Sequence, residues 1–243
     1  MIDLHAHILP GVDDGPATIE AALEMARVAT AAGTRAIATT SHVNYVNRLD
    51  PADLRSAREA LAARLAEAGI ELELLAGGEI APSRLPDLDD DELRALALGG
   101  GRYVLLECPF SPDGANLEAM VADLQQRGFG VLLAHPERSP AFQRDPAQLT
   151  RLVERGALAQ VTTGSLTGDF GEIPRRTAAA MLEQGLLHVL ASDAHDAIHR
   201  GPDLHAADGV LDEAQGEWMT TAVPAAIVAG CRLPERLRSS SAR

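Results

Sequence analysis

The sequence predicts one α/β domain whose parallel strands form a closed or nearly closed barrel. Short apolar runs alternate with amphipathic stretches along the chain of 243 residues. Several runs are apolar throughout, such as AIA at 36–38 and VLL at 131–133, as expected for strands buried on both faces. About seven β-α units without a break in composition favour a barrel. A doubly wound open sheet is the alternative.

The strands and helices can be placed in order along the chain. We expect strands near residues 1–4, 35–40, 71–76, 103–107, 130–134, 158–162 and 187–191. Helical patterns lie between them, near residues 17–32, 51–68, 89–98, 115–128, 146–155, 172–184 and 203–230. Asp50 with Pro51 is typical of a helix start, and Gly33 and Gly69 lie where helices should stop. Residues 1–237 should form a single domain, followed by a disordered tail at 238–243.

Composition excludes several classes of protein. The formal net charge of −14 disfavours binding to nucleic acid or to an anionic membrane surface. No apolar run approaches the ~20 residues of a membrane span, and no secretory signal is expected, so we expect a cytoplasmic protein. The sequence contains no lysine, which excludes P-loop chemistry, Schiff-base chemistry and metal sites bridged by a carboxylated lysine. Its two cysteines are too few for a disulfide framework.

Side chains that can bind metal follow six of the seven expected strands. In chain order they are His5 and His7, His42, Glu79, Glu107, His135, and Asp193 with His195. Barrel enzymes build their active sites at these carboxyl ends. In an extended segment, residues two apart point to the same side, so His-x-His and Asp-x-His each present two ligands together. Asp14, in the loop PGVDDGP beside Asp13, is a further candidate.

This set of ligands indicates a cluster of divalent metal ions. The donors are nitrogen and oxygen without thiolate, which suits manganese, iron, zinc or magnesium. Nine candidates are too many for one ion. They suit two or three ions that share a bridging carboxylate, an arrangement used in phosphoester hydrolysis.

Motifs along the chain resemble those of the PHP superfamily, in which a His-x-His pair, a histidine, a glutamate, a histidine and an Asp-x-His pair follow one another. More specific segments are similar to the bacterial CpsB/YwqE-type phosphatases: HILPGVDDG at 7–15, TTSH at 39–42, GGEI at 77–80, YVLLE at 103–107, AHPER at 134–138, GSLTG at 164–168 and ASDAH at 191–195. The resemblance implies a distorted (β/α)7 TIM-like barrel. It also implies a manganese-dependent protein-tyrosine phosphatase of a capsule or exopolysaccharide system, with a trinuclear metal site.

The resemblance also implies roles for individual residues. The first metal would be held by His5, His7, Glu79 and Asp193. Glu79 would bridge to a second metal, completed by Glu107 and His135. A third would be held by Asp14, His42 and His195. Arg138 and Arg200 would face the substrate phosphate, and their planar guanidinium groups suit a phosphoryl group.

The expected reaction is one-step hydrolysis of a phosphotyrosyl protein by a metal-activated hydroxide, with a bacterial tyrosine kinase as the partner implied by the resemblance. Neither Cys108 nor Cys231 begins the Cys-x5-Arg motif of a cysteine phosphatase. One alternative is a small-molecule phosphatase, such as a histidinol-phosphate phosphatase. The other is a catalytically weak, metal-loaded regulatory binding module. The physiological substrate, the metal used in the cell and the oligomeric state stay open.

Overall fold

Short parallel strands form the centre of the molecule in the computed structural model, which describes residues 1–47, 49–111 and 116–236. Within these residues the strands are β1 (Ile2–Ala6), β2 (Ala36–Thr39), β3 (His42–Val43), β4 (Glu73–Leu75), β5 (Glu79–Ile80), β6 (Tyr103–Glu107), β7 (Gly130–Ala134), β8 (Leu158–Thr162) and β9 (Val189–Ala191). They pair in the orders β1-β2-β4 and β3-β5-β6-β7-β8-β9. Because β3 closely follows β2, and β5 closely follows β4, each pair is one interrupted barrel strand.

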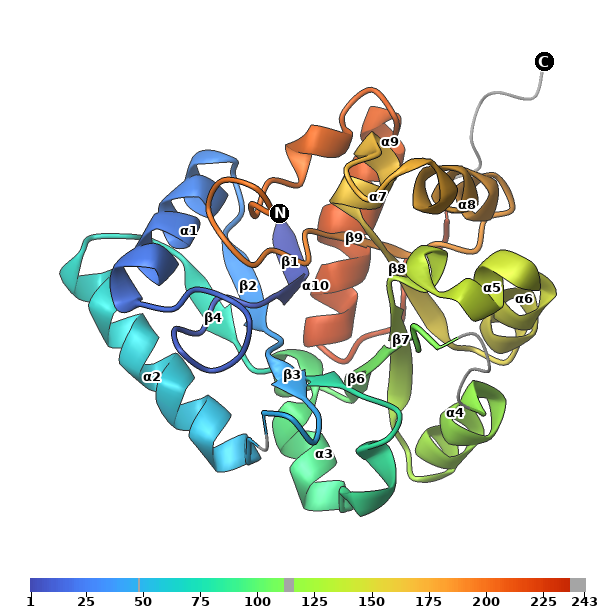
Figure 1. The fold of residues 1–243 in the computed structure, drawn as a ribbon, viewed down its shortest axis with the longest axis horizontal. Coiled ribbons are helices and arrows are strands. Elements are labelled where there is room, and N and C mark those ends of the chain that lie inside the picture. Colours follow the sequence, from blue (N-terminus) through green and yellow to red (C-terminus); the bar gives the residue numbers. More distant parts are fainter. Residues whose placement is uncertain (48, 112–115, 237–243) are drawn as a thin grey trace.

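The first strand also meets the end of the last one. Ala6 forms a parallel bridge with Ala194. The His7 amide donates a hydrogen bond to the Ala194 carbonyl at 2.8 Å, and the Asp193 amide donates to the His5 carbonyl at 2.8 Å. Pairing among the described residues therefore runs around a ring of seven strands, with helices outside it (Figure 1). The predicted α/β fold with a barrel-like arrangement of parallel strands is confirmed, and the bridge between the first and last strands argues against the open-sheet alternative.

The interruption between β4 and β5 depends on Gly78, because side chains approach this residue too closely for a Cβ atom to fit. A Cβ atom on Gly78 would lie 2.7 Å from Leu96 Cδ2 and 3.0 Å from Val43 Cγ2. The strand expected at 71–76 therefore ends before residue 76. The chain then passes through Gly77 and Gly78 and returns to strand pairing as β5. This resumption delivers Glu79, the first residue of β5, to the end of the barrel.

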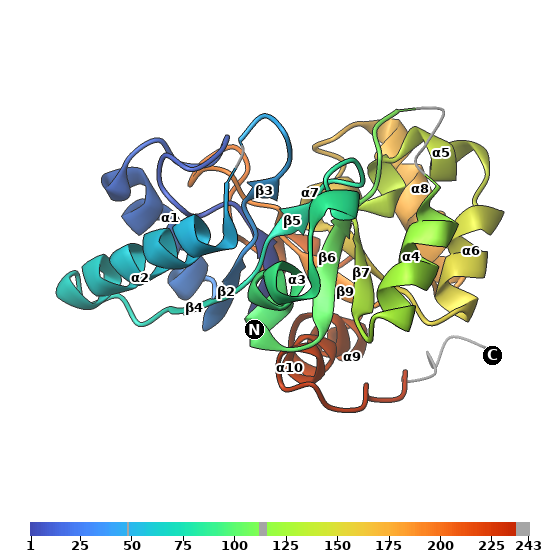
Figure 2. The ribbon, with the colours of Figure 1, turned by 90° about the horizontal axis from the view of Figure 1, so that it is seen from below.

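Most helices lie around the outside of the strands, whereas α10 crosses the end of the barrel near the N-terminus (Figures 1 and 2). Their bounds are α1 (Ile19–Ala31), α2 (Pro51–Glu67), α3 (Asp90–Leu96), α4 (Leu117–Gln126), α5 (Pro140–Arg144), α6 (Ala147–Glu154), α7 (Thr163–Thr167), α8 (Glu172–Glu183), α9 (Glu213–Glu217) and α10 (Val223–Val228). Short 3-10 turns are η1 (Leu85–Asp87), η2 (Leu98–Gly100), η3 (Pro136–Arg138) and η4 (His205–Ala207). As predicted, Asp50 precedes α2 and Pro51 opens it. No described helix is both long enough and apolar enough to cross a membrane.

The helical stretch expected at 203–230 is wrong as a continuous element. Gly209 has a φ of 87°, and Asp212 starts a new helix by accepting a hydrogen bond from the Gln215 amide. A π-helical turn, η5 (Trp218–Ala222), then precedes α10. Pro224 lacks the N–H that would continue the α-helical hydrogen bonds, which explains a change of helix type here. Figure 2 shows α9 and α10 beside the N-terminus, away from β3.

Apolar side chains of the strands form a continuous core. Every residue of β7 and of β8 is buried. This burial on both faces explains why these segments read as apolar runs rather than alternating patterns. The single-domain boundary at residue 237 and the tail at 238–243 fall outside the described residues and stay predictions.

We predict that His188, just before β9, makes folding sensitive to acid. Burial and, to a smaller degree, the Arg236 guanidinium lower the pKa of His188 to about 4 from 6.5. Between these values the unfolded chain binds more protons than the folded chain, so stability falls as the pH falls. From about pH 7 to about pH 4.5 we expect the free energy of unfolding to fall by about 1–2 kcal/mol more than in His188→Gln. Glutamine does not titrate but can still accept the hydrogen bond that His188 Nδ1 accepts from the Ala159 amide.

Urea unfolding of both proteins at the two pH values measures this difference. An equal loss of stability in the two proteins would contradict the assignment.

Candidate metal centre

All nine side chains predicted to bind metal lie at the carboxyl end of the barrel. Each lies in a strand or shortly after one, except Asp14, which the loop after β1 brings back to the same place. Within the described part of the chain, their ligand atoms form groups in which all atoms lie within 4.8 Å of one another. These groups are His7, Asp14, His42 and His195; His5, His7 and Asp193; His5, Glu79 and His135; and His42, Glu79 and Glu107.

Four buried side chains bring their ligand atoms close together on the buried side of the candidate metal centre. His5 Nε2 lies 3.3 Å from His7 Nε2, 3.5 Å from Glu79 Oε2 and 3.4 Å from Asp193 Oδ1. His7 Nε2 lies 3.4 Å and 3.5 Å from the same two carboxylate oxygens. Two imidazole nitrogens that face each other between two carboxylates have the donor set of a divalent cation. These four residues are the set that the family resemblance implied for the first metal.

Glu79 is placed to serve as a bridge. Its Oε1 atom lies 2.9 Å from His135 Nε2, and its Oε2 atom lies 2.9 Å from His42 Nδ1. The two oxygens therefore face different histidines. The resemblance paired Glu107 with His135, whereas the structure groups Glu107 with His42 and Glu79 and groups His135 with His5 and Glu79.

Asp14 marks the open side of the centre. Its Oδ1 atom lies 3.3 Å from His195 Nε2, 3.6 Å from His42 Nε2 and 3.8 Å from His7 Nδ1. The Asp14 side chain is 61% exposed, whereas the His7 side chain is fully buried. The set expected for a third metal is therefore together, at the point where the centre meets solvent.

The pKa values of these groups reflect unbalanced charge. Burial lowers the pKa of His5, but Glu79 and Asp193 outweigh it and raise that pKa to about 9. Burial raises the pKa of Glu79, but His5 and the hydrogen-bonded histidines bring it well below its usual value. Burial and His7 lower the pKa of His195 to about 4, which leaves its imidazole neutral. Without a metal, the carboxylates hold protons on His5, and a divalent cation would supply that positive charge instead.

Unpartnered atoms support the same conclusion. Glu79 Oε2 and His42 Nδ1 are buried and lie 2.9 Å apart, yet they form no hydrogen bond with each other or with another described residue, and His135 Nδ1 is also buried without a hydrogen bond. Buried polar atoms are almost always satisfied in folded proteins. Metal coordination would satisfy the glutamate oxygen and the His42 nitrogen, so the residues present fit a bound metal cluster.

Two strand ends have unusual backbone conformations that orient their side chains. His135 has a φ of 35° and Asp193 has a φ of 51°, and these are the described non-glycine residues with positive φ. Such conformations cost free energy and are concentrated at functional sites. Both residues are among the predicted ligands.

Two residues that carried no predicted role orient the histidines. Asp13 Oδ2 accepts hydrogen bonds from His7 Nδ1 at 2.7 Å and from the His42 amide at 2.9 Å. Gln160 Oε1 lies 3.0 Å from His5 Nδ1 and accepts a hydrogen bond from the His135 amide. Such partners fix the ring of a metal-binding histidine. The signal for Gln160 was a lone amide inside the apolar run 158–162.

Arg138 and Arg200 come together beside Asp193. Arg138 Nη1 lies 2.5 Å from Asp193 Oδ2, and Arg200 Nη2 lies 2.7 Å from the same oxygen. The other oxygen, Oδ1, faces His5 and His7. Asp193 therefore has the candidate metal site on one side and two guanidinium groups on the other.

Comparison with known proteins identifies the family. The sequence model of the family described as "Capsular polysaccharide synthesis, CpsB/CapC" matches residues 1–226. The chain belongs to this family. Tyrosine-protein phosphatase YwqE of Bacillus subtilis (strain 168) is 38% identical over 217 residues, which cover 89% of this chain and 85% of YwqE.

Solved structures agree with the fold. One comes from work on YwqE from Bacillus subtilis and CpsB from Streptococcus pneumoniae, described as unique metal-dependent tyrosine phosphatases. It matches with a TM-score of 0.85 and 33% identity, covering 97% of each chain. A variant of an organophosphorus hydrolase matches with a TM-score of 0.56 and 16% identity, over 93% of this chain and 92% of that one. This second likeness concerns the fold alone.

We predict that Glu79→Gln lowers the amount of bound metal. An amide carries no negative charge and bridges two cations poorly, so the cluster should lose at least one ion. Elemental analysis after manganese loading and gel filtration measures the content. Glu73→Gln, at an exposed position in β4, is the matched control and should bind as much metal as the wild type. Full metal content in Glu79→Gln would rule out the bridging role.

We also predict that Asp13→Asn weakens metal binding without removing a ligand. Burial raises the pKa of Asp13, but its bonds from His7 lower that pKa to about 2, so a carboxylate holds the His7 ring. Loss of this partner should reduce metal affinity about tenfold or more. Competition with a chelating dye measures the affinity. Asp91→Asn, a surface change on α3, is the control. Unchanged affinity in Asp13→Asn would show that His7 needs no such support.

Proposed function

We propose that this chain is a metal-dependent phosphomonoesterase that hydrolyses phosphotyrosyl proteins in a capsule or exopolysaccharide system. The observation that carries the proposal is the convergence of nine candidate ligands and two arginines at one end of the barrel. We propose two to three divalent ions, with manganese as the preferred metal and iron, zinc or magnesium as alternatives. The names of the relatives support the phosphotyrosyl substrate, and the description of the family supports the capsule system.

The chain would contribute binding and orientation to this reaction. A metal ion in such a site supplies hydroxide at neutral pH, because binding lowers the pKa of water from about 15.7 towards about 7. Arg138 and Arg200 would neutralise the phosphoryl oxygens as negative charge develops. A tyrosinate leaving group, whose conjugate acid has a pKa of about 10, needs less proton donation than an alkoxide. The proposal therefore assigns no general acid.

The surroundings of the centre favour a protein substrate over a small molecule. Val46, Ile198 and Phe110 follow β3, β9 and β6 at the same end of the barrel, and they are 88%, 84% and 49% exposed. Exposed apolar side chains around a site can contact the residues that flank a phosphotyrosine. A small phosphate ester is instead expected to be enclosed by its pocket. A tyrosine kinase as the substrate protein and a cytoplasmic location remain predictions from the sequence.

The first test measures phosphate release by protein stripped of metal and reloaded with manganese. A phosphotyrosyl peptide and histidinol phosphate are compared at equal concentration. We expect the peptide to react faster and a chelator to abolish the reaction. His5→Ala, Glu79→Ala and Asp193→Ala should each abolish turnover. Faster hydrolysis of histidinol phosphate would overturn the proposed substrate, and no hydrolysis of either would support the regulatory binding module.

A further inference from the structure

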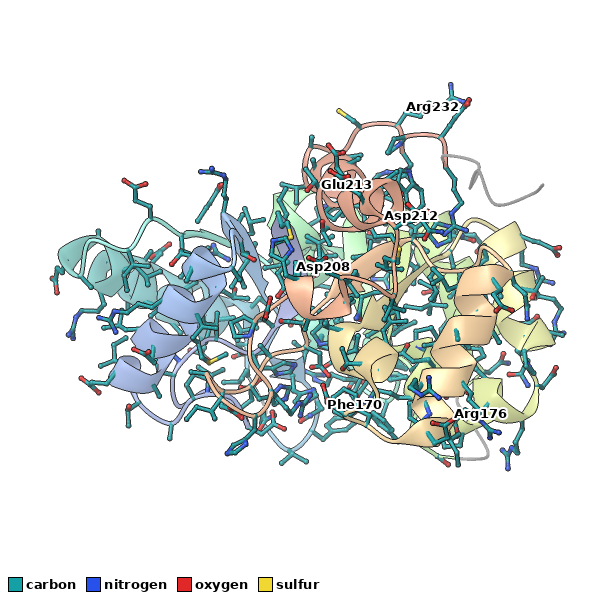
Figure 3. All side chains as sticks on the ribbon, turned by 90° about the horizontal axis from the view of Figure 1, so that it is seen from above. Phe170, Arg176, Asp208, Asp212, Glu213 and Arg232 are labelled. Atoms are coloured by element: carbon teal, nitrogen blue, oxygen red, sulfur yellow. The ribbon has the colours of Figure 1, made fainter. Side chains whose placement is uncertain are left out.

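The segment GSLTG at 164–168 lies beside the two arginines but contributes none of the candidate metal ligands. It forms α7, which ends where Gly168 adopts a φ of 96°. The chain then turns and brings Phe170 against the arginines; the labelled ring is shown in Figure 3. Arg138 Cζ lies 4.3 Å from the centre of the Phe170 ring, and Arg200 Cζ lies 5.5 Å from it. One aromatic ring therefore contacts both guanidinium groups.

The α7 turn fixes this ring and the base of Arg138 together. A Cβ atom on Gly164 would lie 3.0 Å from Phe170 Cε2, so the ring packs directly against the glycine. In the same turn, Ser165 Oγ donates a 2.6 Å hydrogen bond to Glu137 Oε1, and the Thr162 amide donates to the same atom at 3.1 Å. Glu137 is fully buried and adjacent to Arg138. The α7 turn thus positions the backbone of Arg138 and also the Phe170 ring against which the Arg138 side chain packs.

The Phe170 ring can offset the electrostatic repulsion between Arg138 and Arg200. Arg138 and Arg200 both bind the Oδ2 atom of Asp193, which places two positive charges close together. Their repulsion would favour separation of the flexible side chains. A ring face attracts cations through its quadrupole and stacks on the guanidinium plane. Phe110 adds a second ring, whose centre lies 5.2 Å from Arg138 Cζ, but among the described residues Phe170 is the ring within reach of both arginines.

We propose that Phe170 is a positioning residue that holds Arg138 and Arg200 together as one binding site for a phosphoryl group. The nature of this ligand rests on the proposed function. The role of the ring does not require turnover, because it can be read from the binding of inorganic phosphate.

The test is calorimetric titration of inorganic phosphate into the manganese-loaded protein. Phe170→Leu keeps an apolar side chain but removes the ring face, and we expect phosphate affinity to fall about fivefold or more. Phe170→Tyr keeps the ring and should stay within about twofold of the wild type. Tyr45→Leu is the matched control. The centre of the Tyr45 ring lies 5.6 Å from Arg84 Cζ, so this change removes a ring that contacts a different arginine. All variants should hold the same amount of metal.

With the phosphotyrosyl peptide, Phe170→Leu should raise KM by a similar factor and change kcat less. Should Phe170→Leu fold poorly, Gly164→Ala gives an independent test, because its new methyl group displaces the ring by a few tenths of an ångström. It should weaken phosphate binding in the same direction. Wild-type affinity in Phe170→Leu, or a loss in Phe170→Tyr as large as in Phe170→Leu, would overturn the proposal.

Failure of the two proposals can be distinguished. A wild-type protein that binds phosphate but does not hydrolyse the peptide would refute the proposed function and still decide the role of Phe170. A metal-loaded wild-type protein that does not bind phosphate would refute the role of Phe170.

Discussion

The burial of Glu79 against four histidines is the constraint on which the rest of the site depends. A fully buried carboxylate is costly unless positive charge or hydrogen bonds compensate for its lost hydration. Here its oxygens face His5, His7, His42 and His135, and one of the oxygens has no hydrogen bond. Protons on the histidines supply part of the compensation, and divalent cations can supply all of it. The same arrangement that opposes folding without metal therefore favours metal binding.

The barrel makes this concentration of charge possible because its strands are tied together below the site. Asp3 accepts hydrogen bonds from the backbone amides of His5 and Ser192, and thereby joins β1 to the end of β9. The bridge between Ala6 and Ala194 continues the same seam. Mutual repulsion among ligands then acts against a closed ring of backbone hydrogen bonds rather than against flexible loops. Rigid strands of this kind can hold ligands in place before a metal arrives.

The sequence predicted the barrel and the convergence of the candidate ligands for a clear reason, and it missed other features for equally clear reasons. Apolar runs reveal strands, and a histidine such as His135 at the end of a run is visible without coordinates. The split of the third barrel strand was not visible, because it depends on the contact of Gly78 with Leu96, which is distant in sequence. Gln160 and Asp13 were not assigned because their roles exist only through the histidines that they hold. The change of helix type before Pro224 follows from local chemistry and could have been expected.

Asp193 connects the metal centre to the arginines through its two oxygens. Oδ1 faces His5 and His7, whereas Oδ2 accepts both guanidinium groups. A carboxylate used in this way keeps the arginines close to the candidate metals and limits their movement towards solvent. Its positive φ sets the direction of the side chain, so the strain of one residue fixes the separation between two parts of the site. Asp193 at one strand end therefore sets how close the arginines lie to the candidate metal centre, while the segments that carry Arg138 and Arg200 and the Phe170 ring complete their placement.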